Sequence, residues 1–285
     1  MEHPFDRAAE DLGNVVGLEH VNTRIPDQRL ATLYYVSGLG LTRDPYLMTS
    51  VDNMWANVGR SQFHLPTGNP QVVRGITGVV LPEREALLRR LVNVKGQLEG
   101  TAFGFKEHND YVDTVSPWGN RIRCHTPDPR FGRMTLGIPY VELTVPVGTA
   151  WGIARFYQEI LETPTRVEQN GAAPKAIVAV GPDQWLVFQE TEAELPEFDG
   201  HHVQVYLADF SGPYRRLLER GLISQEDDQH QYRFLDIVDL ASNRPLFRIE
   251  HEVRSMRHPL YARPLVNRNP AQTNRTYTPG HDSWR

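Results

Sequence analysis

The sequence predicts an α+β protein built from four βαβββ units, on three observations. In four places a run of alternating apolar and polar residues gives way to helical spacing of the apolar residues. A proline or an aspartate stands at the turn into each of these helices. Each helix is followed by short alternating runs that hold about three further strands. Units of roughly 50 to 65 residues therefore recur four times, which makes coincidence a poor explanation.

The first two units show the pattern most directly. In the first, a strand runs to Ile25, the chain turns at Pro26, and a helix with one apolar face ends at Gly38. In the second, a strand runs to Leu81 and leads through a proline into the helix of "LPEREALLRRLVNVKG". The runs "MWANVGRSQFHL" and "FGFKEHNDYVDTVSPWGNRIRCH" supply the remaining strands of these two units.

The third and fourth units repeat the same order of elements. The stretches "GIPYVELTVPVGTAWGIARFYQEILET" and "GHHVQVYLADFSGPYRRLLERG" each predict a strand followed by an amphipathic helix. The runs "KAIVAVGPDQWLVFQET" and "YRFLDIVDLASNRPLFRIEHEV" supply their further strands. We therefore expect an N-terminal arm over 1–15, one domain of two units over 16–130, a second over 136–253, and a tail over 254–285.

Composition and charge exclude several classes of function. The net charge of -5 and the pI near 6.1 give no electrostatic reason to expect nucleic-acid binding. No apolar run approaches the roughly 20 residues that span a bilayer, so we expect no membrane partner. The first residues resemble no signal peptide, and we expect a cytoplasmic protein. Cys124, the only cysteine, cannot form an internal disulfide and is expected to be a small strand residue.

The C-terminal tail has many Pro, Asn and Arg residues and no apolar periodicity, which predicts an extended arm. Tyr261, Leu265 and Trp284 are its candidate anchors. They could hold the tail on this subunit or on a neighbouring one, and the second arrangement would make a homo-oligomer.

Four motifs resemble the vicinal oxygen chelate superfamily, which includes glyoxalase I, extradiol ring-cleaving dioxygenases and antibiotic-resistance proteins. They are "GLEHVNTRIPD", "SPWGNRIRCH", "GIPYVELTVP" with "ARFYQEILETP", and "GHHVQVYLAD". The resemblance covers about 16–253. It implies two glyoxalase-like cup-shaped sheets, with a divalent metal bound by the first and last strands of the units. The four-unit pattern is similar to that of hydroquinone-cleaving dioxygenases.

Aligning the first strands on their turn residues places His20, Ile76, Tyr140 and His202 at one structural position. The last strand of the fourth unit adds Glu250 as the carboxylate that the resemblance implies. Two histidines and a carboxylate with open positions suit non-haem Fe(II). A strict count from the preceding turn would place a different residue, Arg248, at the position of the carboxylate.

How the units pair decides which of these residues can bind one ion. Pairing of the first unit with the fourth brings His20 and His202 into one cup with Glu250, and it leaves a second cup as scaffold. Pairing of the first with the second would instead group His20 with His64 and His125. We favour the first arrangement because it concentrates the ligands in one cup.

Other polar residues of the cup have candidate roles in binding and catalysis. His64 could be a fourth ligand, an acid/base group beside the metal, or a solvated strand-end residue. Asn22 and Arg24 share the face of His20, and Arg24 and Arg248 could hold the charge of a substrate. Tyr206, beside His202, could donate to bound oxygen or substrate.

Three functions are compatible with these residues, and we expect the first, with Fe(II) as the metal. An Fe(II) extradiol-type dioxygenase would cleave a catechol- or hydroquinone-like aromatic molecule. A glyoxalase-like lyase or isomerase would use Zn, Ni or Mn, and a four-ligand shell that includes His64 would favour it. A binding protein without metal would hold a small aromatic ligand in the cup.

Overall fold

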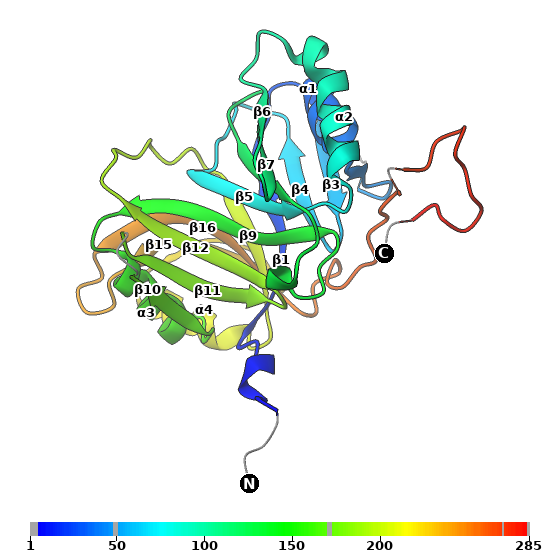
Figure 1. The fold of residues 1–285 in the computed structure, drawn as a ribbon. Helices are drawn as coiled ribbons and strands as arrows, with labels where there is room; N and C mark the ends of the chain where they lie inside the picture. The colour runs from blue at the N-terminus through cyan, green and yellow to red at the C-terminus, as the bar shows by residue number, and fades with distance from the viewer. Residues whose placement is uncertain (1–4, 48–50, 170–172, 270, 284–285) are drawn as a thin grey trace.

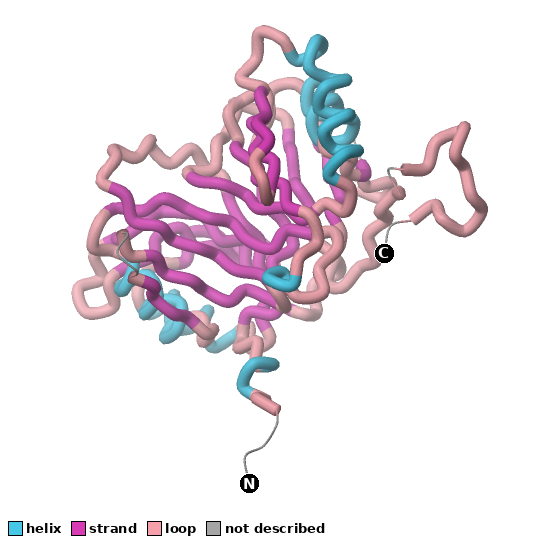
Figure 2. Tube along the Cα trace, in the orientation of Figure 1, coloured by secondary structure: helices cyan, strands magenta, loops and turns pink. Residues whose placement is uncertain are grey.

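The computed structural model describes residues 5–47, 51–169, 173–269 and 271–283 and shows two eight-stranded sheets (Figures 1 and 2). The strands are β1 (Val15–Asn22), β2 (Thr42–Arg43), β3 (Asn53–Val58), β4 (Ser61–Pro66), β5 (Gly75–Val80), β6 (Gly104–Glu107), β7 (Tyr111–Val115), β8 (Arg121–His125), β9 (Gly137–Pro146), β10 (Thr165–Glu168), β11 (Lys175–Gly181), β12 (Gln184–Thr191), β13 (His202–Leu207), β14 (Ile223–Asp228), β15 (Gln231–Val238) and β16 (Pro245–Ser255). The helices are α1 (Gln28–Ala31), α2 (Arg84–Lys95), α3 (Ala150–Ile160) and α4 (Ser211–Glu219), with the π-helix η2 (Thr32–Gly38) and the short 3₁₀-helices η1 (Ala8–Glu10), η3 (Gly96–Leu98) and η4 (Pro129–Phe131). The predicted α+β class and the four repeated units are confirmed.

Local sequence explains the start of the first helix. The side chain of Asp27 accepts hydrogen bonds from the backbone nitrogens of Arg29 at 2.7 Å and Leu30 at 3.0 Å. These bonds satisfy donors that have no partner within the helix, which is the usual role of an aspartate at this position. The sequence signal at the turn is therefore a helix cap, and η2 continues the helix to Gly38 as predicted.

Sheet order shows which units pair. One sheet runs β14-β15-β16-β13-β1-β4-β3-β2 and the other β10-β11-β12-β9-β5-β8-β7-β6. The first unit therefore pairs with the fourth through β1 and β13, and the second pairs with the third through β5 and β9. We call the concave faces of these sheets the first cup and the second cup.

The helices pack in pairs that follow the halves of the chain, whereas each sheet draws on both halves. The first half brings α2 against η2, the second brings α3 against α4, and α3 also contacts strands of both sheets. One apolar core, to which all four units contribute, joins the elements. The division into domains over 16–130 and 136–253 remains a prediction.

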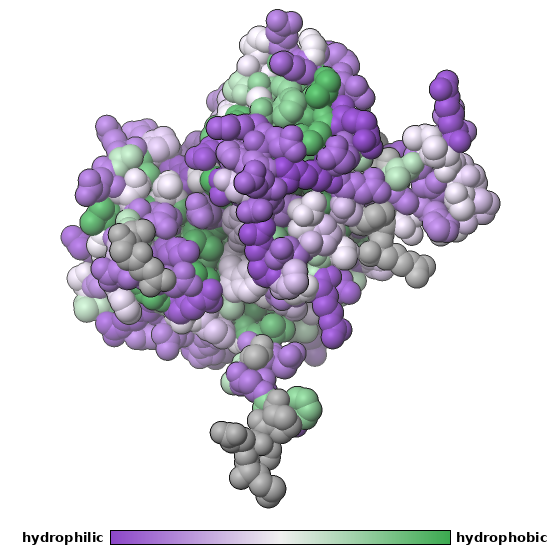
Figure 3. All heavy atoms as spheres, viewed as in Figure 1, coloured by the Kyte–Doolittle hydropathy of each residue, from purple (hydrophilic) through white to green (hydrophobic). Residues whose placement is uncertain are grey.

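The surface of the molecule is mostly hydrophilic on the face shown in Figure 3. Hydrophobic residues on the face shown in Figure 3 form separate patches among hydrophilic ones. In the described part of the chain, no helix is long and apolar enough to cross a membrane.

The C-terminal tail contacts the first cup and the strand ends beside it. The ring of Tyr261 packs edge-on against Tyr206 at 4.9 Å, and Arg263 pairs with the fully buried Asp44 at 2.8 Å. The tail is thus anchored on its own subunit through Tyr261, while Trp284 lies outside the described residues.

Candidate metal centre

Strand register brings three histidines onto one face of the first cup. Across the β1–β13 pair, His20 lies opposite Gln204 and Asn22 lies opposite His202. On the other side of β1, Asn22 lies opposite His64 of β4. One nitrogen from each histidine can be chosen so that all three lie within 4.8 Å of one another. Since an ion holds imidazole nitrogens at about 2.0–2.1 Å, only small side-chain shifts would close this set around one ion.

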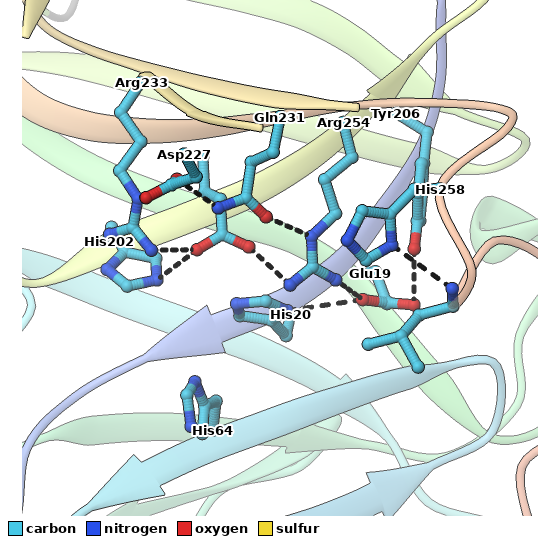
Figure 4. A network of polar contacts seen from close by, with 12 residues as sticks. Glu19, His20, His64, His202, Tyr206, Asp227, Gln231, Arg233, Arg254 and His258 are labelled. Carbon is cyan, nitrogen blue, oxygen red and sulfur yellow. Dashed lines mark hydrogen bonds and ion pairs between the residues drawn. The ribbon is translucent and has the colours of Figure 1, made fainter. Parts of the chain in front are cut away.

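An irregularity of β1 places an acidic residue beside the first histidine. The register of β1 against β13 shifts between Leu18 and His20, as at a β-bulge. Glu19 and His20 therefore contact each other despite being adjacent in a strand, with Glu19 Oε2 3.4 Å from His20 Nδ1 (Figure 4). Alternation of side chains along a regular strand would have predicted opposite faces.

Each of the three histidines has one ring nitrogen engaged by a neighbouring oxygen. Asn53 Oδ1 lies 2.8 Å from His64 Nε2, and Glu250 Oε1 lies 3.1 Å from His202 Nδ1. Within the described part of the chain, the buried Nε2 atoms of His20 and His202 have no hydrogen-bond partner. A carboxylate or amide on the distal nitrogen is the usual way in which a metal-binding imidazole is oriented. The arrangement therefore fits a divalent ion.

The electrostatic environment keeps two of these rings neutral. Burial lowers the pKa of His20 well below its usual value, and the nearby Arg254 lowers it further. Burial likewise lowers the pKa of His64 to about 3, with His202 as a second cause. A neutral imidazole has the lone pair that a metal needs, so at neutral pH neither ring must lose a proton to bind one.

Two glutamates of β16 contact His202 from different sides. Glu250 lies opposite His202 in the sheet and approaches Nδ1, whereas Glu252 Oε2 lies 3.5 Å from Nε2 and its side chain is almost fully buried. In the first unit His20 lies opposite Gln62, and His64 follows two residues later. The same offset in the fourth unit leads from Glu250 to Glu252. Sequence reasoning missed Glu252, although the unit-to-unit register could have found it.

A network of charges lies beside His20 and His202, and His64 lies apart from it (Figure 4). Arg254 contacts Glu19 at 3.0 Å and Glu252 at 2.6 Å, and Arg233 contacts Glu250 at 2.5 Å and also Glu252. With Asp227, 3.6 Å from Arg233, four carboxylates face two guanidinium groups. The formal excess of two negative charges equals the charge of one divalent cation, which favours a cation at this position.

The other residues predicted for the site fall into two groups. Tyr206 belongs to the network, since its hydroxyl donates to Glu19 Oε1 at 2.9 Å and burial raises its pKa. Arg248 lies farther along β16, half exposed and bound to Asp236 at 2.7 and 3.1 Å. Arg24 is exposed beyond the end of β1. Neither arginine contacts the histidines in any described interaction.

The second cup has different residues at the same register. Gly78 lies opposite both Tyr140 and Arg123, as Asn22 lies opposite both His202 and His64. This register aligns four pairs of positions in the two cups: His20 with Ile76, His64 with Arg123, His202 with Tyr140, and Glu252 with Val187. The predicted equivalence of His20, Ile76, Tyr140 and His202 is therefore confirmed.

Side chains of the second cup contact one another. The ring of Tyr140 lies over Gly78, where a Cβ atom would come within 2.4 Å of it. The Tyr140 hydroxyl lies 2.9 Å from Nε2 of His125, and Arg123 binds Asp113 at 2.8 and 3.1 Å. His125 therefore belongs to the scaffold cup and not to the cluster of His20.

Comparisons with known proteins show the fold. Neither a family model nor a curated protein matches the sequence. A mutant of glyoxalase I from Zea mays matches with 12% identity over 87% of this chain and 95% of that one, at a TM-score of 0.57. A "putative dioxygenase" from Bacillus subtilis matches with 12% identity over 85% of this chain and 86% of that one, at a TM-score of 0.55. The predicted glyoxalase-like fold is thus confirmed.

Proposed function

We propose that the protein is a metal-dependent enzyme of the vicinal oxygen chelate type, with a divalent ion held by His20, His64, His202 and Glu252. The observation that carries this proposal is the group of three histidine nitrogens within 4.8 Å, in which the buried Nε2 atoms of His20 and His202 have no hydrogen-bond partner among the described residues. Imidazole and carboxylate ligands suit Fe, Mn, Ni and Zn alike.

The number of ligands favours a non-oxidative reaction. Four protein ligands leave two positions on a six-coordinate ion, which a substrate with two adjacent oxygens can fill alone. A bound divalent ion polarises such oxygens as a Lewis acid. Glu250, the more exposed carboxylate beside His202, is the group to which we assign proton transfer. This assignment supports a glyoxalase-like lyase or isomerase with Zn, Ni or Mn.

A specific feature of His64 supports the second candidate, the Fe(II) extradiol-type dioxygenase. His64 is only partly buried, its ring stacks on Trp55 at 3.7 Å, and Asn53 engages its Nε2. If these contacts hold His64 as an acid/base group, three ligands remain and the ion keeps room for both an aromatic diol and oxygen. Arg24, Arg248 and Tyr206 would then be candidates for contacts with the aromatic substrate.

A metal-loaded protein assayed with two substrate panels tests these candidates. Oxygen uptake would be measured with catechols and hydroquinones after Fe(II) loading. Isomerisation of thiol adducts of 2-oxoaldehydes would be measured after loading with Zn, Ni or Mn. We expect the second activity; oxygen uptake above background with ring cleavage would support the dioxygenase instead.

The variant His64→Gln separates the two candidates without reference to a substrate. In the four-ligand arrangement it weakens metal binding, whereas in the three-ligand arrangement the ion stays bound and only turnover falls. A wild-type protein that binds no divalent metal would contradict both and leave the metal-free binding protein. The proposal of an aromatic substrate depends on the dioxygenase candidate. A cytoplasmic location and a homo-oligomer formed through the tail are proposals that this test does not address.

A further inference from the structure

Gln204 lies in the first cup and has a buried, unpaired amide nitrogen that a bound metal ion would not satisfy. Its side chain is fully buried, and neither the amide nitrogen nor the amide oxygen has a hydrogen-bond partner. It lies on the central strand β13, opposite His20 on one side and opposite Glu252 on the other. An unpaired buried amide costs free energy, so native proteins rarely keep one without a partner for it.

The chemistry of the amide identifies what is missing. The amide nitrogen of Gln204 is a donor and has no lone pair for a cation. It therefore needs an acceptor atom close to His20. Under the proposed function the unpaired Nε2 atoms of His20 and His202 face the ion and are not available as acceptors. A molecule bound beside the ion can supply this acceptor, and an oxygen atom is the best acceptor for an N–H donor.

A second amide repeats this arrangement on the other central strand. Asn22 follows His20 by two residues, as Gln204 follows His202, and it lies opposite His202 in the sheet. Its buried Oδ1 also lacks a partner. The two histidines and the two amides thus alternate across the β1–β13 pair. The cup offers a ligand one amide donor, Gln204 Nε2, and two amide acceptors, Asn22 Oδ1 and Gln204 Oε1.

We propose, on the basis of the proposed function, that Gln204 determines specificity by donating its Nε2–H to an oxygen of the small molecule bound at the metal. Asn22 Oδ1 accepts a hydrogen bond from an O–H or N–H of the same molecule. These contacts select a molecule that presents an oxygen acceptor to Gln204 and an O–H or N–H donor to Asn22, in addition to the oxygens that the proposed function places on the ion.

Acetohydroxamate is a suitable probe because it has two adjacent oxygens and an N–H group. Its affinity for Co²⁺-loaded protein would be measured by calorimetry and by the visible spectrum of Co²⁺, in wild type, Gln204→Met and Gln204→Asn. Glu142→Gln, at the register position of Gln204 in the second cup, is the matched control. We expect Gln204→Met to lower the affinity for acetohydroxamate by about tenfold or more, because one hydrogen bond to a charged group is lost. The affinity for Co²⁺ should stay within about twofold of wild type.

Thermal unfolding of the metal-free proteins gives a second readout. Gln204→Met removes an unpaired buried amide, so its melting temperature should rise above that of wild type. Gln204→Asn keeps the amide on a shorter side chain and should bind acetohydroxamate with intermediate affinity. Unchanged acetohydroxamate affinity in Gln204→Met would overturn this inference alone. A wild type that binds no Co²⁺ would overturn the proposed function and this inference together.

Discussion

The two cups of the molecule share one architecture and differ in how their polar groups are satisfied. In the second cup Tyr140 covers Gly78 and its hydroxyl contacts His125, so these polar groups satisfy one another. In the first cup buried atoms of His20, Asn22, His202 and Gln204 have no hydrogen-bond partner among the described residues. The same backbone therefore supports either a packed interior or a site that needs a ligand. The difference lies in side chains at matched register positions, not in the fold.

The largest expected effect on metal affinity comes from removing His20, and a histidine of the second cup provides the control. His20→Ala should lower the affinity for Zn²⁺ or Co²⁺ by more than about 100-fold, because loss of a ligand exceeds the 10- to 100-fold effect typical of residues that only orient one. His125→Ala, a buried histidine of the second cup, is the matched control and should leave the affinity unchanged. Calorimetric titration checks both, and equal losses would contradict the distinction between the cups.

The two glutamates of β16 should differ in a graded way. Glu252→Gln should weaken metal binding more than Glu250→Gln, because Glu252 lies on the Nε2 side of His202 and Glu250 on the Nδ1 side. Glu250→Gln should cost about 10- to 100-fold, as for an orienting residue. The same titration measures both affinities, and the reverse order would restore Glu250 as the ligand expected from the sequence.

The pH dependence of stability should show the depressed pKa of the first cup. His64 has a folded pKa of about 3, below the usual value of about 6.5, so the unfolded chain binds more protons between these values. The free energy of unfolding of the metal-free protein should therefore fall as pH falls from about 6.5 toward 3. Urea unfolding at several pH values measures this, and the His64→Gln variant should show a smaller slope. Identical slopes in the two proteins would argue against a neutral His64.

The smallest effect should come from the scaffold of the second cup. Tyr140→Phe removes the hydroxyl beside His125 and should cost about 1 kcal/mol of stability, the typical net value of one hydrogen bond. Its metal affinity should match that of wild type. Denaturant unfolding together with the metal titration checks this, and altered metal binding would show that the cups are coupled.

Much of the fold can be predicted from the sequence because the pattern of one βαβββ unit occurs in it four times. The spacing of apolar residues predicts the units. Alignment of the first strands on their turns correctly places His20, Ile76, Tyr140 and His202 at equivalent positions of the four units. Concentration of ligands also favours the observed pairing of the first unit with the fourth.

The details of the site could not be predicted, for two physical reasons. A β-bulge changes which face a side chain takes, so the contact of Glu19 with His20 is invisible to the rule of alternation. The offset between parallel strands is set by long-range pairing, so the sequence alone could not separate Glu250 from Glu252. The contacts of Arg254 likewise depend on side chains that are distant in sequence.

Anomalous X-ray diffraction from crystals equilibrated with Co²⁺ tests the central claim most directly, because it locates ions in both cups at once. We predict one strong peak per chain, bounded by His20, His64 and His202, and none beside Tyr140. An absence of density among the three histidines at saturating Co²⁺, or a peak of equal strength in the second cup, would contradict the account.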